Sequence, residues 1–123
     1  MHRIFLILAG VFALLAVGLG AFGSHVLEGR LGEDMLRAFE TGVRYHFYHA
    51  LGLGLIALVL ERLGSLRLLV WAGWLMSAGV VLFSGSIYVM ALSGSRMFAL
   101  VTPTGGVAFL VAWGLFVAGV MRR

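Results

Sequence analysis

Hydrophobic residues occur in four long runs that contain no charged side chain. The runs cover residues 4–23, 45–60, 68–95 and 97–121. A helix needs about 20 apolar residues to cross a hydrocarbon core about 30 Å thick, and three of these runs are long enough on their own. The second run is shorter, and the stretch before it can extend it. We therefore predict one all-α domain over residues 1–123, with four spanning helices at about 4–24, 44–61, 68–92 and 103–121.

The segment between the first two predicted spans has a different pattern. Apolar residues recur there at every fourth position: Leu31, Met35, Phe39, Val43 and Phe47. Glu33 precedes Arg37 by four residues and Glu40 precedes Arg44 likewise, a spacing that pairs charges on a helix surface. We expect an amphipathic interfacial helix here, lying in the membrane interface or folded onto the bundle, with Gly42 at the bend into the second span.

Composition changes the picture from a helical protein to an integral membrane protein. Hydrophobic residues make up 62% of the 123 residues and charged residues 11%. Soluble domains have roughly 45–50% and about 25% of these. A soluble fold, a disordered chain and a nucleic-acid-binding module are therefore excluded. The chain has no cysteine, which excludes disulfides, thiolate metal ligands and cysteine nucleophiles.

Four spans would bring both termini to the same side of the membrane. That side then carries five arginines, at positions 3, 62, 67, 122 and 123, and the other side carries four, at positions 30, 37, 44 and 96. Arginine is favoured on the cytoplasmic side of a membrane protein. We expect a multi-pass protein of the inner or plasma membrane with both termini in the cytoplasm.

Small residues are frequent and are spaced for close helix packing. Glycine accounts for 18 residues, and pairs such as Ala16 with Gly20 and Gly73 with Ser77 lie four positions apart. Small residues at this spacing allow membrane helices to approach closely. Packing within the bundle or between copies of the chain explains them.

Four motifs with unusual polar residues lie where spans end or begin on one membrane face. They occupy residues 20–25, 45–49, 83–88 and 102–106. Up-and-down topology places the end of the first span, the start of the second, the end of the third and the start of the fourth at the same face. We therefore expect one polar, aromatic end of the bundle, which contacts lipid or a partner.

Three histidines belong to this predicted end. His46 and His49 are three residues apart and share a helix face, and His25 comes from the neighbouring span. Imidazoles ligate transition metals and haem, and His25 and His49 are the metal candidates. Interfacial histidines that bond to backbone or lipid head groups explain the same pattern. We predict no cofactor and keep metal, haem or quinone as the alternative.

Hydroxyl side chains form a further candidate site. Ser77, Ser84 and Tyr88 share one face of the third span, which must turn inward because a hydroxyl facing lipid lacks a partner. The face serves either as a polar track for a quinone, lipid head group or small solute, or for hydrogen bonds between helices. Thr102 precedes Pro103, a pattern typical of an N-cap followed by the first helical residue. Gly105 and Gly106 follow, and would let an anion approach the free backbone N–H groups.

The chain resembles a known family at these motifs. They read Gly-Ala-Phe-Gly-Ser-His at 20–25, Tyr45 with His49 four residues later, Leu-Phe-Ser-Gly-Ser-Ile-Tyr at 82–88 and Thr-Pro-Thr-Gly-Gly at 102–106. In this order they are similar to domain-of-unknown-function family 423, small bacterial inner-membrane proteins with eukaryotic relatives. The resemblance covers nearly the whole chain and implies a four-helix membrane protein without an assigned reaction. His46 departs from the family's pattern, whereas His25 and His49 match it.

Three functions remain possible from the sequence. The first is a non-enzymatic structural or accessory protein that supports membrane integrity, or binds lipid or a partner at the polar end, alone or as a homo-oligomer. The second is a ligand- or redox-binding module that uses His25, His46, His49, Ser84, Tyr88 and Thr102. The third is a small-solute transporter, for which the spans lack the mid-membrane charge that ion pathways use.

Overall fold

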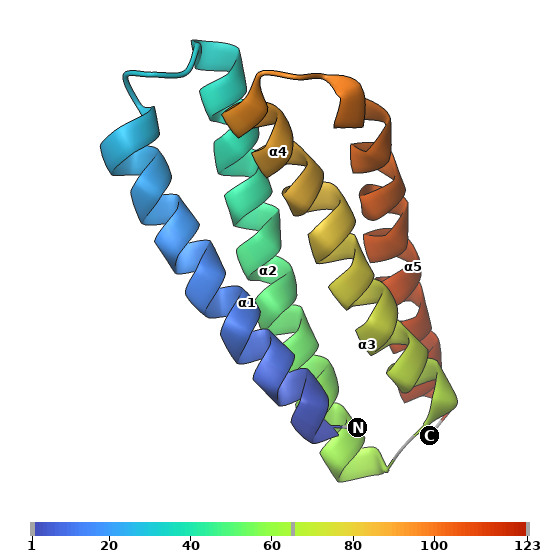
Figure 1. Ribbon diagram of the computed structural model, residues 1–123. Coiled ribbons are helices and arrows are strands. Elements are labelled where there is room, and N and C mark those ends of the chain that lie inside the picture. Colours follow the sequence, from blue (N-terminus) through green and yellow to red (C-terminus); the bar gives the residue numbers. More distant parts are fainter. Residues whose placement is uncertain (1, 65, 123) are drawn as a thin grey trace.

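Four long helices run up and down in an elongated bundle (Figure 1). The computed structural model describes residues 2–64 and 66–122, and every regular element in these ranges is helical. The first helix is α1 (His2–Phe22) with a π-helical turn at Gly23–Leu27, and the second is α2 (Glu33–Leu63). The third consists of α3 (Arg67–Gly79), a π-helical turn (Val80–Ser84) and α4 (Gly85–Ser93). A 3₁₀ turn (Met97–Leu100) leads into the fourth, α5 (Val101–Met121).

The bundle consists of two antiparallel pairs. α1 packs along α2, and α3 packs along α5, while α2 also contacts α3 and α4 (Figure 1). The start of α1 and the end of α5 lie at one end of the bundle. Residues 28–32 and 94–96 lie at the other end, which we call the polar end. The prediction of an all-α chain is thus confirmed as four long apolar helices, each able to span a membrane.

Glycines with a positive φ end two of the long helices. Gly64 follows α2 with a φ of 90°, and Gly94 follows α4 with a φ of 74°. Each backbone N–H still donates to a carbonyl of the last turn, from Gly64 to Leu60 and from Gly94 to Met90. Residues with a side chain rarely adopt this backbone conformation, so these two glycines set the helix lengths.

The interior contains two apolar clusters. The larger lies toward the end of the bundle where α1 begins and α5 ends. It consists of Phe5, Leu53, Ile56, Ala57, Leu60, Leu69, Ala72, Met76 and Ala112. The smaller lies at the polar end and consists of Leu27, Phe39 and Ala91. Gly73 lets Phe5 pack against α3, because a Cβ on Gly73 would lie 2.4 Å from the Phe5 ring. Small residues therefore bring the helices together, as predicted.

The described residues contain no separate interfacial helix between the first two spans, and the stretch packs onto the bundle, the other arrangement that the sequence allowed. Residues 33–44 are the first turns of α2, a continuous helix of 31 residues. The apolar stripe is real, but it faces the bundle, with Phe39 fully buried against Leu27 and Ala91. A helix of this length measures about 46 Å, so α2 exceeds the hydrocarbon core and its first turns project beyond it.

Gly42 does not bend α2 as expected, because it lies in a tight contact with the third long helix. The Ser84 hydroxyl donates to the Gly42 carbonyl oxygen at 2.7 Å. A Cβ on Gly42 would lie 3.2 Å from Cγ2 of Ile87. The glycine thus brings two backbones close together rather than interrupting the helix.

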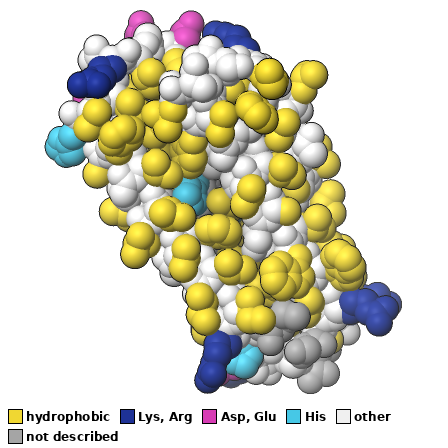
Figure 2. Space-filling view, in the orientation of Figure 1, with side chains coloured by type: hydrophobic (Ala, Val, Ile, Leu, Met, Phe, Trp, Pro, Cys, Tyr) yellow, Lys and Arg dark blue, Asp and Glu magenta, His cyan; other side chains and the backbone are white. Residues whose placement is uncertain are grey.

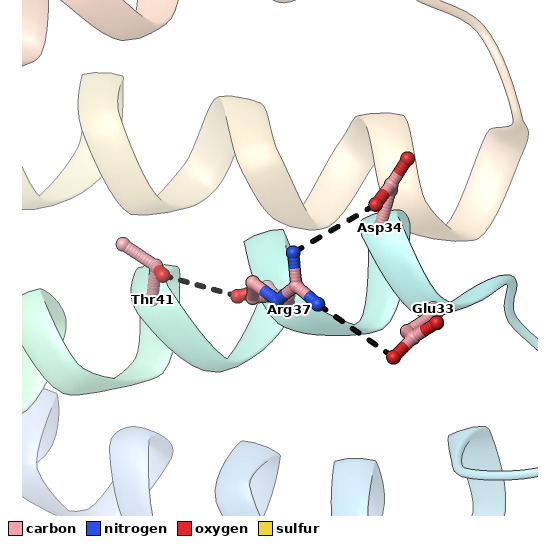
Figure 3. Close-up of polar contacts among 4 residues, drawn as sticks. All are labelled: Glu33, Asp34, Arg37 and Thr41. Carbon is pink, nitrogen blue, oxygen red and sulfur yellow. Dashed lines mark hydrogen bonds and ion pairs between the residues drawn. The ribbon is translucent and has the colours of Figure 1, made fainter.

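Exposed charged side chains lie on the first turns of α2. Arg37 lies 3.7 Å from a carboxylate oxygen of Glu33 and 3.8 Å from one of Asp34 (Figure 3). The predicted Glu33–Arg37 pair is therefore present. Glu40 and Arg44, also expected to pair, do not come within ion-pair distance in the part of the chain described. Pairs this exposed contribute little to stability, and they mark the water-facing part of α2.

Candidate functional site: an aromatic cleft at the polar end

Three of the four polar motifs come together in the half of the bundle nearer the polar end. Residues 45–49 lie on α2, residues 83–88 on the π turn and α4, and residues 102–106 on α5. Hydrogen bonds join them in pairs, between His46 and Tyr88 and between Ser86 and Thr102. The convergence inferred from topology therefore holds for these segments.

The fourth motif packs against α2 through Gly20 and Gly23, but its histidine does not join the others. His25 lies in the π turn that ends α1, with its side chain exposed, whereas His46 and His49 are buried. Among the described residues no three His, Asp or Glu side chains are grouped so that they could hold a metal ion. The histidines are therefore three separate sites in this fold.

Thr102 also differs from its expected role. α5 begins at Val101, and its N-cap residue is Leu100, which makes no side-chain capping bond. The Thr102 hydroxyl is hydrogen-bonded to the Ser86 hydroxyl instead. Pro103 is tolerated because the first N–H groups of a helix have no partner within it. Thr102, predicted to be an N-cap residue, thus forms a hydrogen bond between helices instead.

His46 is enclosed between α1, α2 and α4. Its side chain is 3% exposed, and Nδ1 lies 2.8 Å from the Tyr88 hydroxyl oxygen. The Phe12 ring of α1 meets the imidazole edge-on, with ring centroids 6.0 Å apart. Nε2 is sealed from the surface and has no hydrogen-bond partner among the described residues. The inward-facing hydroxyls of Ser84 and Tyr88 therefore bond between helices, and they line no open track.

His49 lies one turn further along α2 and contacts α5 rather than α4. Its Nδ1 donates to the Tyr45 carbonyl oxygen at 2.7 Å. The imidazole lies flat on the Phe109 ring, with centroids 3.6 Å apart and planes at 6°. Nε2 of His49 has no hydrogen-bond partner among the described residues, and unlike Nε2 of His46 it is not enclosed. His49 is therefore a polar residue with a free ring nitrogen, and it lines a cavity.

The cavity is a cleft of about 440 Å³ between α2, the π turn and α5. Most of the residues that line it are aromatic. The full lining consists of Tyr45, Tyr48, His49, Phe83, Gly106, Phe109, Leu110 and Trp113. We call this the aromatic cleft. The mouth is flanked by Leu110, 75% exposed, and Tyr48, 52% exposed, so it opens sideways from the bundle. Its volume lies in the range of small-molecule sites, roughly 300–1,000 Å³.

Backbone contact between α5 and the π turn builds the wall of the cleft. A Cβ on Gly105 would lie 2.3 Å from the backbone nitrogen of Phe83, so only glycine permits this approach. Gly106 is different, since a Cβ there would meet only the Phe83 ring at 3.9 Å. The Thr-Pro-Thr-Gly-Gly motif therefore packs α5 against the π turn, and the cleft results from this packing.

Sequence reasoning found His49 but missed most of its aromatic neighbours. Phe109 and Trp113 lie in a span that has no polar face to indicate which residues turn inward, and Phe83 is an apolar residue beside the hydroxyl face of the third span. The π turn at Val80–Ser84 is equally invisible in the sequence pattern. Such turns insert one residue into a helix and are frequent at functional sites.

The outer surface defines the class of protein. Hydrophobic side chains cover the visible face along its length, and charged side chains gather at its two ends (Figure 2). The four spans His2–Leu27, Glu33–Leu63, Arg67–Ser93 and Met97–Met121 are all long and apolar enough to cross a membrane. A soluble protein does not expose an apolar surface of this extent. The chain is a multi-pass helical membrane protein.

Comparison with known proteins places it within that class. Residues 19–106 match the family described as "Protein of unknown function (DUF423)", and the chain belongs to this family. The UPF0382 membrane protein YwdK of Bacillus subtilis is 46% identical over 98% of both chains. The UPF0382 inner membrane protein YgdD of Escherichia coli is 40% identical over 98% of this chain and 91% of its own. No solved structure matches. The chain is a protein of the inner or cell membrane, as predicted.

Proposed function

We propose that this protein is a non-enzymatic accessory protein of the membrane that binds an amphipathic membrane molecule in the aromatic cleft. The observation that carries the proposal is His49, a side chain only 6% exposed that lines the cleft and whose Nε2 has no hydrogen-bond partner among the described residues. A few polar groups on a mainly apolar, concave surface are typical of ligand sites. A buried polar group without a partner costs free energy, and a ligand would remove that cost.

The position of the cleft favours a ligand that arrives from the bilayer. Its mouth opens sideways between exposed residues of α2 and α5, at the level of Tyr45 and Tyr48. Tyrosines are enriched where the hydrocarbon core meets the head groups. A ligand with a polar head and an apolar tail would place its head at His49 and its tail among the lipids.

The buried serines of the interior already have structural partners. Ser84 bonds to Gly42, Ser86 to Thr102, and Ser77 to the Gly73 carbonyl oxygen. These bonds support the accessory function over catalysis. The separation of His25 from His46 and His49 argues against haem or metal as the ligand. Membrane lipids are thus the proposed partners, with a second copy of the chain or another membrane protein as further ones.

Filling the cleft tests the proposal. Gly106→Leu introduces a side chain where a Cβ has room, and we expect it to displace a bound amphiphile. Gly114→Leu on the same helix is the matched control, because a Cβ on Gly114 meets nothing within 4 Å. Native mass spectrometry of both proteins in mild detergent counts the bound molecules. Equal occupancy in the two variants, or none in the unaltered protein, would contradict the proposal.

A further inference from the structure

The hydrogen bond at Nδ1 of His49 decides which ligands the cleft accepts. A carbonyl oxygen only accepts hydrogen bonds, so the contact with the Tyr45 carbonyl requires a proton on Nδ1. In the neutral ring the other nitrogen, Nε2, then carries a lone pair and no proton. None of the residues that line the cleft is a carboxylate that would stabilise an imidazolium. The polar atom that His49 offers to a ligand is therefore an acceptor.

The shape of the cleft adds a second requirement. Four rings besides the imidazole are linked around it: Phe109 stacks on His49, Phe83 lies 5.6 Å from Phe109, and Tyr45 lies 5.3 Å from Phe83. The Trp113 ring lies 6.0 Å from the imidazole. Aromatic rings attract one another in tilted and offset arrangements at such distances. A flat ring fits these walls better than a flexible glycerol head group does.

We propose, building on the proposed function above, that the ligand presents an aromatic hydroxyl to Nε2 of His49. The chemical class that combines a flat ring, hydroxyl donors and a long apolar tail within a membrane is the reduced isoprenoid quinone. The ring hydroxyl donates to Nε2 in this arrangement, and the tail leaves through the mouth beside Leu110. An oxidised quinone offers only carbonyl acceptors, so it leaves Nε2 unpartnered. The contact with His49 thus favours the reduced form, by binding alone.

Two matched probes test the need for a donor. 3-Bromo-5-decylphenol carries a hydroxyl donor, and its methyl ether has the same ring, tail and bromine without the donor. Bromine quenches tryptophan fluorescence at contact, and Trp113 lines the cleft. Trp71→Phe and Trp74→Phe together leave Trp113 as the only tryptophan of the three, and both replaced side chains are at least 40% exposed.

The expected result is tighter binding of the phenol than of the ether, by roughly three- to tenfold beyond their ratio of partition into empty micelles. His49→Phe keeps a ring against Phe109 and removes both nitrogens, so there the preference should vanish. If His49→Phe does not fold, the affinities of the unaltered protein for phenol and ether can still be compared with their partition into empty micelles. Equal corrected affinities for phenol and ether would overturn the inference.

Two further outcomes separate the inference from the function on which it rests. Quenching of Trp113 by each probe is compared between the protein with an open cleft and the same protein carrying Gly106→Leu. If neither probe quenches more strongly in the first, the cleft binds no such molecule and both proposals fail. If 1,2-dioctanoylglycerol displaces the phenol at equal concentration, a lipid hydroxyl serves as well as a ring. The preference for quinols then fails while the amphiphile site stands.

Discussion

The imidazole of His49 rests face to face on the ring of Phe109, with 3.6 Å between their centroids. The contact joins α2 to α5 at the wall of the aromatic cleft, and Phe109 is 4% exposed. A Cβ on Gly79 would lie 2.5 Å from the same ring, so Phe109 also fills the contact between α5 and α3. One side chain therefore supports the fold and shapes the site.

Phe109→Ala should lower the free energy of unfolding by about 3 kcal/mol, because it leaves a cavity between three helices. Unfolding in mixed micelles with increasing dodecyl sulfate measures the change. Phe98→Ala is the control, since Phe98 is 39% exposed and should cost far less. Equal losses in the two variants would show that the stacked contact does not hold α2 and α5 together.

The two adjacent glycines of α5 should respond differently to the same substitution. Gly105→Ala places a Cβ 2.3 Å from the Phe83 backbone, which cannot move without shifting the π turn. We expect a loss of roughly 1–3 kcal/mol or misfolding. Gly106→Ala places its Cβ at an ordinary contact distance and should be neutral or slightly stabilising. Thermal unfolding in detergent, followed by circular dichroism, compares them, and the reverse order would refute the close approach.

Tyr88→Phe should cost about 0.5–2 kcal/mol, because it removes the hydrogen bond to Nδ1 of a histidine that has no partner at Nε2. Tyr48→Phe is the control, since Tyr48 is 52% exposed and its hydroxyl makes no hydrogen bond to the described residues. Combining Tyr88→Phe with His46→Phe completes a double-mutant cycle. Strictly additive losses would mean that the two side chains do not interact.

The absence of cysteine from the chain makes its orientation directly measurable. Gly29→Cys lies at the polar end, at a position with no neighbour within 4 Å of a Cβ, and His2→Cys lies at the opposite end on an exposed residue. With cytoplasmic termini, a membrane-impermeant maleimide should label Cys at 29 in intact cells. The Cys at position 2 should react only after permeabilisation. The opposite labelling pattern would invert the predicted orientation.

Charge-free length was enough to predict the four spans, because a bilayer leaves a long apolar segment few alternatives to a helix. The same reasoning failed for residues 33–44. Their apolar stripe was correct, but a stripe cannot tell a membrane surface from the side of a neighbouring helix. Phe39 packs against Leu27 and Ala91, and Ala91 is distant from both of the others in sequence.

The candidate site was predictable only in part, and for a related reason. His49 stood out as a polar residue in an apolar run, whereas Phe109 is one of nine phenylalanines in the chain. Its pairing with His49 depends on how closely α5 approaches the π turn, and Gly105 sets that distance. His25 shared a predicted membrane face with the other histidines, but it lies exposed in the π turn that ends α1.

The π turn at Val80–Ser84 gives the third long helix one residue more than a regular helix would hold there. An α-helix advances by about 100° per residue, so this surplus sets the rotation of α4 relative to α3. Deleting one residue within 80–84 would restore regular winding and swing Tyr88 away from His46. An alignment gap of a single position in this segment would therefore mark a relative whose helices meet through a different set of side chains.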